Sequence, residues 1–220
     1  MGSHVRNPVL NGLYQGYLVS HDAAAFSKKV AQRYAIGTLE RLCAHDQRMT
    51  RRAAVLAIGM VGKFESNDVM GRALIDEDRG VRTLADNGIR SLWCRAGSER
   101  QQRHLAYVIR MNAARRYEEA IRRATRLIEQ APDLAEGWNQ RAIAFFSSGR
   151  FVESIRDCEQ TLELNPYHFG AATGMAQCHL HLNDRAAALE VFRRALQLNP
   201  GLEGVRAHIL YLQRALKNQE

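Results

Sequence analysis

The fold is indicated most clearly by residues 138–166, WNQRAIAFFSSGRFVESIRDCEQTLELNP. Apolar residues recur at helical spacing in two runs, 142–146 and 155–162. Ser147-Ser148-Gly149 separates the two runs, and Asn165-Pro166 stops the second. The stretch therefore predicts two antiparallel helices joined by a short turn.

The same pattern recurs along the C-terminal half of the chain. Three of the four prolines, Pro132, Pro166 and Pro200, lie 34 residues apart. Other shared registers hold residues of similar size, among them Ile121, Ile155 and Leu189; the small Ala120, Ser154 and Ala188; and the bulky Met111, Phe145 and His179. A single helix pair has too little surface to form its own core, so successive copies are expected to stack.

The pattern resembles the tetratricopeptide repeat (TPR). The residues that carry the resemblance are Trp138, Ala142, Phe145, Ser154, Cys158 and Pro166. The resemblance implies three units within residues 98–202, and these are 101–134, 135–168 and 169–202. Arg115 departs from the pattern, because it occupies the turn position where the later units have Gly149 and Asn183.

Residues 203–220 predict one further amphipathic helix. Its apolar face holds Val205, Ile209, Leu212 and Leu216, and its polar face holds Arg206, Gln213, Arg214 and Lys217. A helix with one solvated face suits the end of a repeat array.

A shorter repeat precedes the 34-residue one. Residues 50–59 echo residues 81–90 at a spacing of 31, and this resembles the HEAT-like repeat of bilin lyases and many bacterial scaffold proteins over about 46–97. The resemblance implies a structural arginine at Arg51 and at Arg82.

The remaining N-terminal part completes a helical segment over residues 22–97. Asp22 to Ala44 is expected to form one long helix, and residues 1–21 an irregular extension. Residues 1–4 resemble the remnant of an expression tag. At the junction of the two repeat types, Gly97 suits a helix end, and Ser98 with Gln101 suits a capping box that starts the next helix. The predicted fold is therefore an all-α solenoid of antiparallel helix pairs that runs through both repeat types.

Composition excludes several protein classes. With 46% hydrophobic and 25% charged residues the chain matches an ordinary globular protein and not a disordered one. No apolar run is long enough for a membrane span, and no signal peptide is recognisable. The four cysteines, Cys43, Cys94, Cys158 and Cys178, form no C-x-x-C pair, so they indicate reduced, mostly buried thiols and a cytoplasmic protein.

Catalytic and metal-binding motifs are missing from the sequence. It contains no phosphate-binding glycine loop, no Gly-x-Ser-x-Gly and no His-Glu-x-x-His. The nearest metal-like cluster is Cys178-His179-Leu180-His181, which has too few ligands for zinc. We therefore expect a protein that is not an enzyme, without cofactor or metal.

The formal charge of +8 rests mainly on arginine. Seven arginines lie within 24 residues: Arg103, Arg110, Arg115, Arg116, Arg122, Arg123 and Arg126. Such a cluster suits a phosphate backbone, yet these arginines spread around two predicted helices and have acidic neighbours for i,i+4 pairing. The alternative hypothesis is a nucleic-acid-binding module that uses these arginine-rich helices around 103–126 and the HEAT-like repeats.

The TPR resemblance implies a concave groove lined by the first helix of each unit. Its positions are Gln102, Leu105, Ile109 and Asn112 from the first unit, Asn139, Ile143 and Phe146 from the second, and Thr173, Gln177, Leu180 and His181 from the third. Chaperone-binding TPR domains clamp a carboxylate, and the matching positions here are Leu105, Ile109, Gln140, Gly170 and Gly174. None carries a positive charge, which disfavours that clamp.

The leading hypothesis is therefore a scaffold or adaptor that binds an apolar or amphipathic peptide segment of a protein partner in this groove. A third hypothesis, an enzyme related to bilin lyases, follows from the HEAT-like resemblance alone, and no nucleophile or cofactor pocket supports it. No membrane partner is expected.

Overall fold

A computed structural model describes residues 8–217, and within that range every regular element is a helix. The expectation about a tag remnant at residues 1–4 lies outside this range. The chain divides into two compact units, residues 1–92 and residues 93–220. Each unit is described by itself below.

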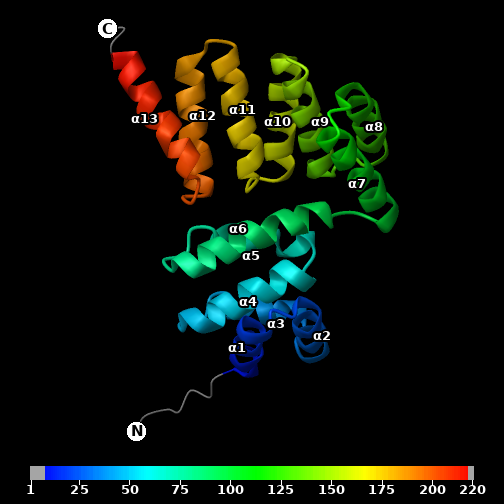
Figure 1. Cartoon of the computed structure of the whole chain (residues 1–220), viewed down its shortest axis with the longest axis vertical. Helices are drawn as coiled ribbons and strands as arrows, with labels where there is room; N and C mark the ends of the chain where they lie inside the picture. The colour runs from blue at the N-terminus through cyan, green and yellow to red at the C-terminus, as the bar shows by residue number, and fades with distance from the viewer. Residues whose placement is uncertain (1–7, 218–220) are drawn as a thin grey trace. The chain divides into compact units, whose positions relative to one another are not determined.

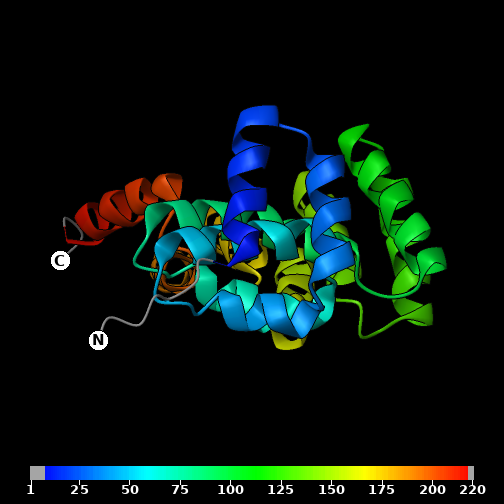
Figure 2. The ribbon, with the colours of Figure 1, turned by 90° about the horizontal axis from the view of Figure 1, so that it is seen from below.

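The first unit is built from short helices. They are α1 (Val9–Ser20), α2 (Ala23–Arg33), α3 (Ile36–Leu42), α4 (Arg48–Val61), a 3₁₀ turn η1 (Phe64–Ser66), α5 (Asn67–Ala73) and α6 (Arg79–Cys94), whose last two residues belong to the second unit. Helices α1 and α2 pack on each other and on α4 (Figure 2). Leu10, Leu39 and Ile58 are fully buried in this unit.

Two expectations for the N-terminal part are wrong. Residues 9–20 form α1 and are not irregular, because Leu10 and Tyr14 bury one face of the helix while Gly12 and Gly16 lie in open space on the other. Residues 22–44 are not one helix either. The backbone at Tyr34 is extended, and the Tyr34 hydroxyl accepts a hydrogen bond of 2.9 Å from the backbone N–H of Leu10, which ties the break between α2 and α3 to the start of α1.

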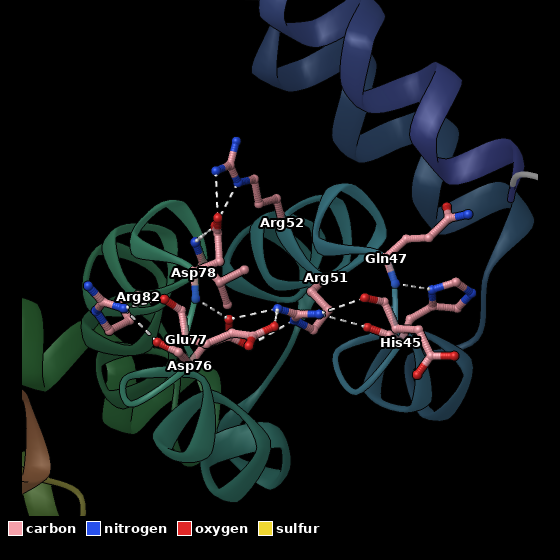
Figure 3. Close-up of polar contacts among 10 residues, drawn as sticks. His45, Gln47, Arg51, Arg52, Asp76, Glu77, Asp78 and Arg82 are labelled. Carbon is pink, nitrogen blue, oxygen red and sulfur yellow. Dashed lines mark hydrogen bonds and ion pairs between the residues drawn. The ribbon is translucent and has the colours of Figure 1, made fainter.

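The two arginines of the 31-residue repeat play the same structural role (Figure 3). Arg51 donates to the backbone carbonyls of residues 45 and 46, each at 3.0 Å. Arg82 donates to those of residues 76 and 77, at 2.6 and 2.9 Å. Both guanidinium groups therefore satisfy carbonyls of the loop that precedes their own helix. Arg51 also forms an ion pair of 2.9 Å with Asp76.

Helices α4 and α6 approach each other at two glycines. A Cβ atom built on Gly59 would lie 2.9 Å from the Cα of Gly88, and a Cβ on Gly88 would lie equally close to Gly59. Real Cβ atoms do not tolerate such a distance to backbone, so this crossing requires glycine on both helices.

The second unit consists of helix pairs followed by a last helix (Figure 1). Its helices are α7 (Glu99–Ala113), α8 (Tyr117–Gln130), α9 (Ala135–Ser147), α10 (Phe151–Leu164), α11 (Phe169–His181), α12 (Arg185–Leu198) and α13 (Glu203–Lys217). Each of the three predicted 34-residue units thus contains one helix pair. The predicted capping box is confirmed, because Ser98 and Gln101 bond reciprocally at the start of α7.

The turns inside the three pairs share one backbone conformation. Arg115, Gly149 and Asn183 have φ values of 58°, 75° and 62°. This left-handed conformation is easy for glycine, tolerated by asparagine and strained for arginine. The 34-residue spacing is therefore visible in the backbone and not only in the side chains.

Small residues let the helices of a pair and of neighbouring pairs pack closely. Ala142, Cys158 and Ala172 belong to one buried cluster, and Ala176, Ala188 and Leu212 are among the residues of the next. The cluster that contains Leu212 joins α13 to the last pair, so α13 covers the apolar end of that pair as predicted for a capping helix.

Candidate functional site

The candidate surface lies on the first helices of the three pairs. Helix α9 contacts both α7 and α11, so these three helices form one layer of the second unit. Side chains of α9 and α11 meet near both ends of these helices. We call the end with the buried Glu136–His168 contact the closed end, and the end with the accessible Phe146–His181 contact the open end.

A buried carboxylate organises the closed end. Glu136, on the first turn of α9, is 5% exposed and accepts hydrogen bonds from Asn139 at 2.9 Å and from Gln140 at 2.8 Å. Its second oxygen lies 3.0 Å from Nε2 of His168, the residue that caps α11. The Trp93 ring, which belongs to the same unit, stacks on His168 with 4.0 Å between ring centroids. This network joins α9 to α11.

The direction of these hydrogen bonds fixes the proton on His168. Nδ1 of His168 accepts from the backbone N–H of Ala171 at 2.9 Å, so Nε2 carries the hydrogen and donates it to Glu136. Burial opposes ionisation of Glu136, but the hydrogen bond and the electrostatic attraction of His168, together with the hydrogen bonds from Gln140 and Asn139, hold the pKa of Glu136 below its ordinary value. Glu136 is thus a buried anion held by three N–H donors.

Amides continue the network toward α7. The side-chain amide of Asn112 donates to the backbone carbonyl and to the side-chain oxygen of Gln140, both at 2.9 Å. Asn112 and Asn139 are both predicted groove positions. In the structure the Asn112 amide joins α7 to α9, whereas the Asn139 amide donates to Glu136 within α9.

The open end presents apolar and aromatic side chains. Ile143 is 40% exposed, and Phe146 and Leu180 are half-buried. His181 is exposed, and its ring stacks on Phe151 with 4.5 Å between centroids, while Phe146 meets both rings edge-on. The structure therefore brings Phe146 of α9 and His181 of α11 together, with Phe151 of α10 as a third member.

The other predicted groove residues contribute unequally. Leu105 is 1% exposed and packs with Leu127 and Leu134, so its assignment to an accessible groove is wrong. Asn139 is 8% exposed and is also withdrawn from the surface, because it serves Glu136. Gln102 donates to backbone carbonyls of residues 95 and 97 at the start of α7. Ile109, Thr173 and Gln177 are half-buried.

Sequence reasoning missed three members of this site: Glu136, His168 and Phe151. Phe151 was detectable, since it shares a register with Tyr117, one unit earlier. Glu136 and His168 lie near the two ends of the unit 135–168 and are 32 residues apart, so the 34-residue period itself gave no signal for their pairing.

Most of the seven arginines have partners within their own helix pair. Arg103 pairs with Glu99 at 3.5 Å, and both Arg116 and Arg123 pair with Glu119. Arg110 and Arg123 lie over the Tyr107 ring, at 5.6 and 5.1 Å from its centroid. Arg115 occupies the strained turn, and Arg122 and Arg126 are exposed on α8. The cluster is thus largely a network of surface pairs.

The described residues offer no arrangement for metal binding or thiol catalysis. Within residues 8–217 there is no group of three or more His, Cys, Asp or Glu residues able to hold a metal ion. Burial raises the pKa of Cys43 and Cys158 to about 12, so these two thiols are poor nucleophiles. Cys94 is exposed, contrary to the expectation of mostly buried thiols. No helix in this range is long and apolar enough to cross a membrane.

Known proteins with similar sequences include a protein named for its TPR repeats, in agreement with the helix pairs of the second unit. A TPR repeat-containing protein of Rhizobium etli is 31% identical over 114 residues, which are 52% of this chain and 56% of that protein. Rat Sperm-associated antigen 1 is 33% identical over 104 residues, which are 47% of this chain and 12% of that protein. The chain thus spans little more than half of the first relative and about one eighth of the second.

Solved structures share the fold. The first TPR of Spaghetti (RPAP3), bound to the HSP90 peptide SRMEEVD, aligns with a TM-score of 0.53 and 21% identity and covers 55% of this chain and 96% of that one. Two family models described as tetratricopeptide repeat match residues 113–169 and 145–216. Residues 113–216 of this chain therefore contain tetratricopeptide repeats.

Proposed function

We propose that this chain is a non-enzymatic adaptor that binds a segment of a protein partner on the open end of the α9–α11 layer. The observation that carries the proposal is the cluster of Ile143, Phe146, Leu180 and His181. These side chains are at least partly accessible, lie on two neighbouring helices and present apolar and aromatic surface. Residues of this kind supply most of the binding energy at peptide interfaces.

The surface favours an apolar or amphipathic segment over an acidic chain terminus. The five positions that would form a carboxylate clamp hold Leu105, Ile109, Gln140, Gly170 and Gly174, and none of them is cationic. Gln177 is half-buried beside the cluster and supplies an amide for the backbone of the bound segment. The reduced-thiol composition favours a cytoplasmic location for this activity.

Charge substitutions in the cluster test the proposal. Phe146→Glu and Leu180→Glu each place a carboxylate where the partner's apolar side chain would lie, so capture of a protein partner from the native lysate should be lost. Val152→Glu is the matched control, because Val152 is 49% exposed on α10 and is a similar apolar-to-acid change. Capture that is unchanged by Phe146→Glu and Leu180→Glu would contradict the assignment. Circular dichroism of each variant checks that the helices are retained.

The nucleic-acid alternative rests on the positive potential around α7 and α8. Besides burial, Arg123, Arg100 and Arg126 all lower the pKa of His104, which places several cations around one face. This alternative predicts that affinity falls steeply with salt, with a linear relation between the logarithms of affinity and salt concentration. Capture that survives nuclease and depends on Phe146 favours the adaptor. Recovery that collapses with nuclease favours the alternative.

A further inference from the structure

A second surface lies at the end of the array, in a cleft of about 400 Å³ between α12 and α13. Leu189 of α12 and Leu210 and Leu216 of α13 supply its apolar walls. Leu189 belongs to the core, but Leu210 is 56% exposed. The volume is near the lower end of the range for binding pockets, and it is open to solvent over an apolar wall.

Helix α13 is not polar over its whole outer side. The sequence predicts an apolar face through Val205, Ile209 and Leu212, which is buried as expected. Leu210 and Tyr211, outside that face, are 56% and 64% exposed. Terminal helices of repeat arrays usually present a polar outer surface, because nothing stacks on them. The exposed Leu210 beside a cleft therefore indicates a surface on which a further helix packs.

The charge of the cleft limits what that helix can be. Arg193, Arg214 and Lys217 line it, and no acidic side chain does. None of these three forms an ion pair with any residue in the range 8–217. A second copy of the chain is a poor occupant, since its formal charge is also +8. Charge complementarity requires carboxylates next to an aliphatic anchor.

We propose that the α12–α13 cleft docks an acidic amphipathic helix of a partner protein. Aliphatic side chains of that helix enter between Leu189, Leu210 and Leu216, and its carboxylates pair with Arg193, Arg214 and Lys217. This site is separate from the α9–α11 cluster, so one chain can hold two protein segments at once, as an adaptor requires.

The probe is a fluorescein-labelled synthetic peptide of 14 residues, with Leu at i, i+3, i+4 and i+7 on one face and Glu elsewhere. Its affinity is measured by fluorescence anisotropy at several salt concentrations. The wild-type chain should bind this peptide, with affinity falling as salt rises. A peptide with Lys in place of every Glu, and one with Ser in place of every Leu, should bind at least about tenfold more weakly.

Neighbouring residues provide matched variants. Arg193→Glu and Leu210→Ser should each weaken binding by about tenfold, whereas Arg194→Glu and Tyr211→Ser should not, because only the first two positions line the cleft. Arg193→Glu and Arg194→Glu change the net charge by the same amount. All four replaced side chains are exposed, so the fold is expected to survive.

Three results would overturn the proposal. Equal loss with Arg193→Glu and Arg194→Glu would indicate a general charge effect, and equal binding of the Lys peptide would remove the role of the cations. Loss of binding with Phe146→Glu would place the peptide on the α9–α11 cluster instead. Unchanged binding with Phe146→Glu supports a separate site, and it leaves the proposed function to its own test.

Discussion

Replacing Glu136 removes the carboxylate that joins α9 to α11. Glu136→Ala deletes the acceptor of three hydrogen bonds, from Asn139, Gln140 and His168, at 2.8 to 3.0 Å. The three donors are buried and would be left without a partner, so the expected loss is about 3–5 kcal/mol in the free energy of unfolding. For a unit of this size that corresponds to about 10–20 °C in Tm. Glu136→Gln keeps one acceptor oxygen and should cost about 1–2 kcal/mol.

The assay is urea and thermal unfolding followed by circular dichroism. Glu153→Ala is the control, because Glu153 is 38% exposed in its side chain and its pair with Arg150 is screened by solvent, so its loss should stay within about 0.5 kcal/mol. The lowered pKa of Glu136 also gives a pH dependence. The ionised Glu136 carboxylate stabilises the fold at pH values above its ordinary pKa of about 4.5, and this stabilisation is lost as the pH falls through the lower pKa of the folded state. Glu136→Gln should lose this pH dependence. A cost below about 1 kcal/mol for Glu136→Ala would refute the role of the network.

Three further substitutions test the packing. Arg115→Gly should stabilise the chain by about 0.5–1 kcal/mol in urea unfolding, because it relieves the left-handed strain, and Arg115→Ala, which keeps that strain, should give no such gain. Gly88→Ala should destabilise by about 1–3 kcal/mol, since its Cβ would meet backbone, while Gly12→Ala in open space should stabilise by about 0.5–1 kcal/mol; equal effects in thermal melts would disprove the close crossing. Arg51→Leu should cost about 3 kcal/mol, because it strands the largely buried Asp76, and a neutral result would mean the ion pair is dispensable.

Features that follow from local pattern were predictable. The 34-residue period predicted the three helix pairs, because apolar spacing and the stop at each of Pro132, Pro166 and Pro200 depend on neighbouring residues only. The turn positions at Gly149 and Asn183 were readable for the same reason, and they located the equivalent strain at Arg115. The HEAT-like resemblance implied a structural arginine at Arg51 and at Arg82, and the structure shows that each bonds two backbone carbonyls.

Features that depend on contacts between distant residues were not predictable. The break at Tyr34 depends on a hydroxyl that bonds residue 10, and periodicity carries no information about that contact. The predicted groove included two buried residues at one end, Leu105 and Asn139. They were assigned to the groove only from their positions in the TPR pattern. Their burial results from packing on Leu134 and from the Glu136 network.

The central claim is that a partner segment binds on the open end of the α9–α11 layer. The most direct test is amide hydrogen exchange of the full chain, with and without a peptide selected against it from a random display library. The account predicts slower exchange in residues 139–147 and 173–181 for the wild-type chain, and no slowing with Leu180→Glu. Protection confined to α8, α10 or α13, with α9 and α11 unchanged, would contradict it.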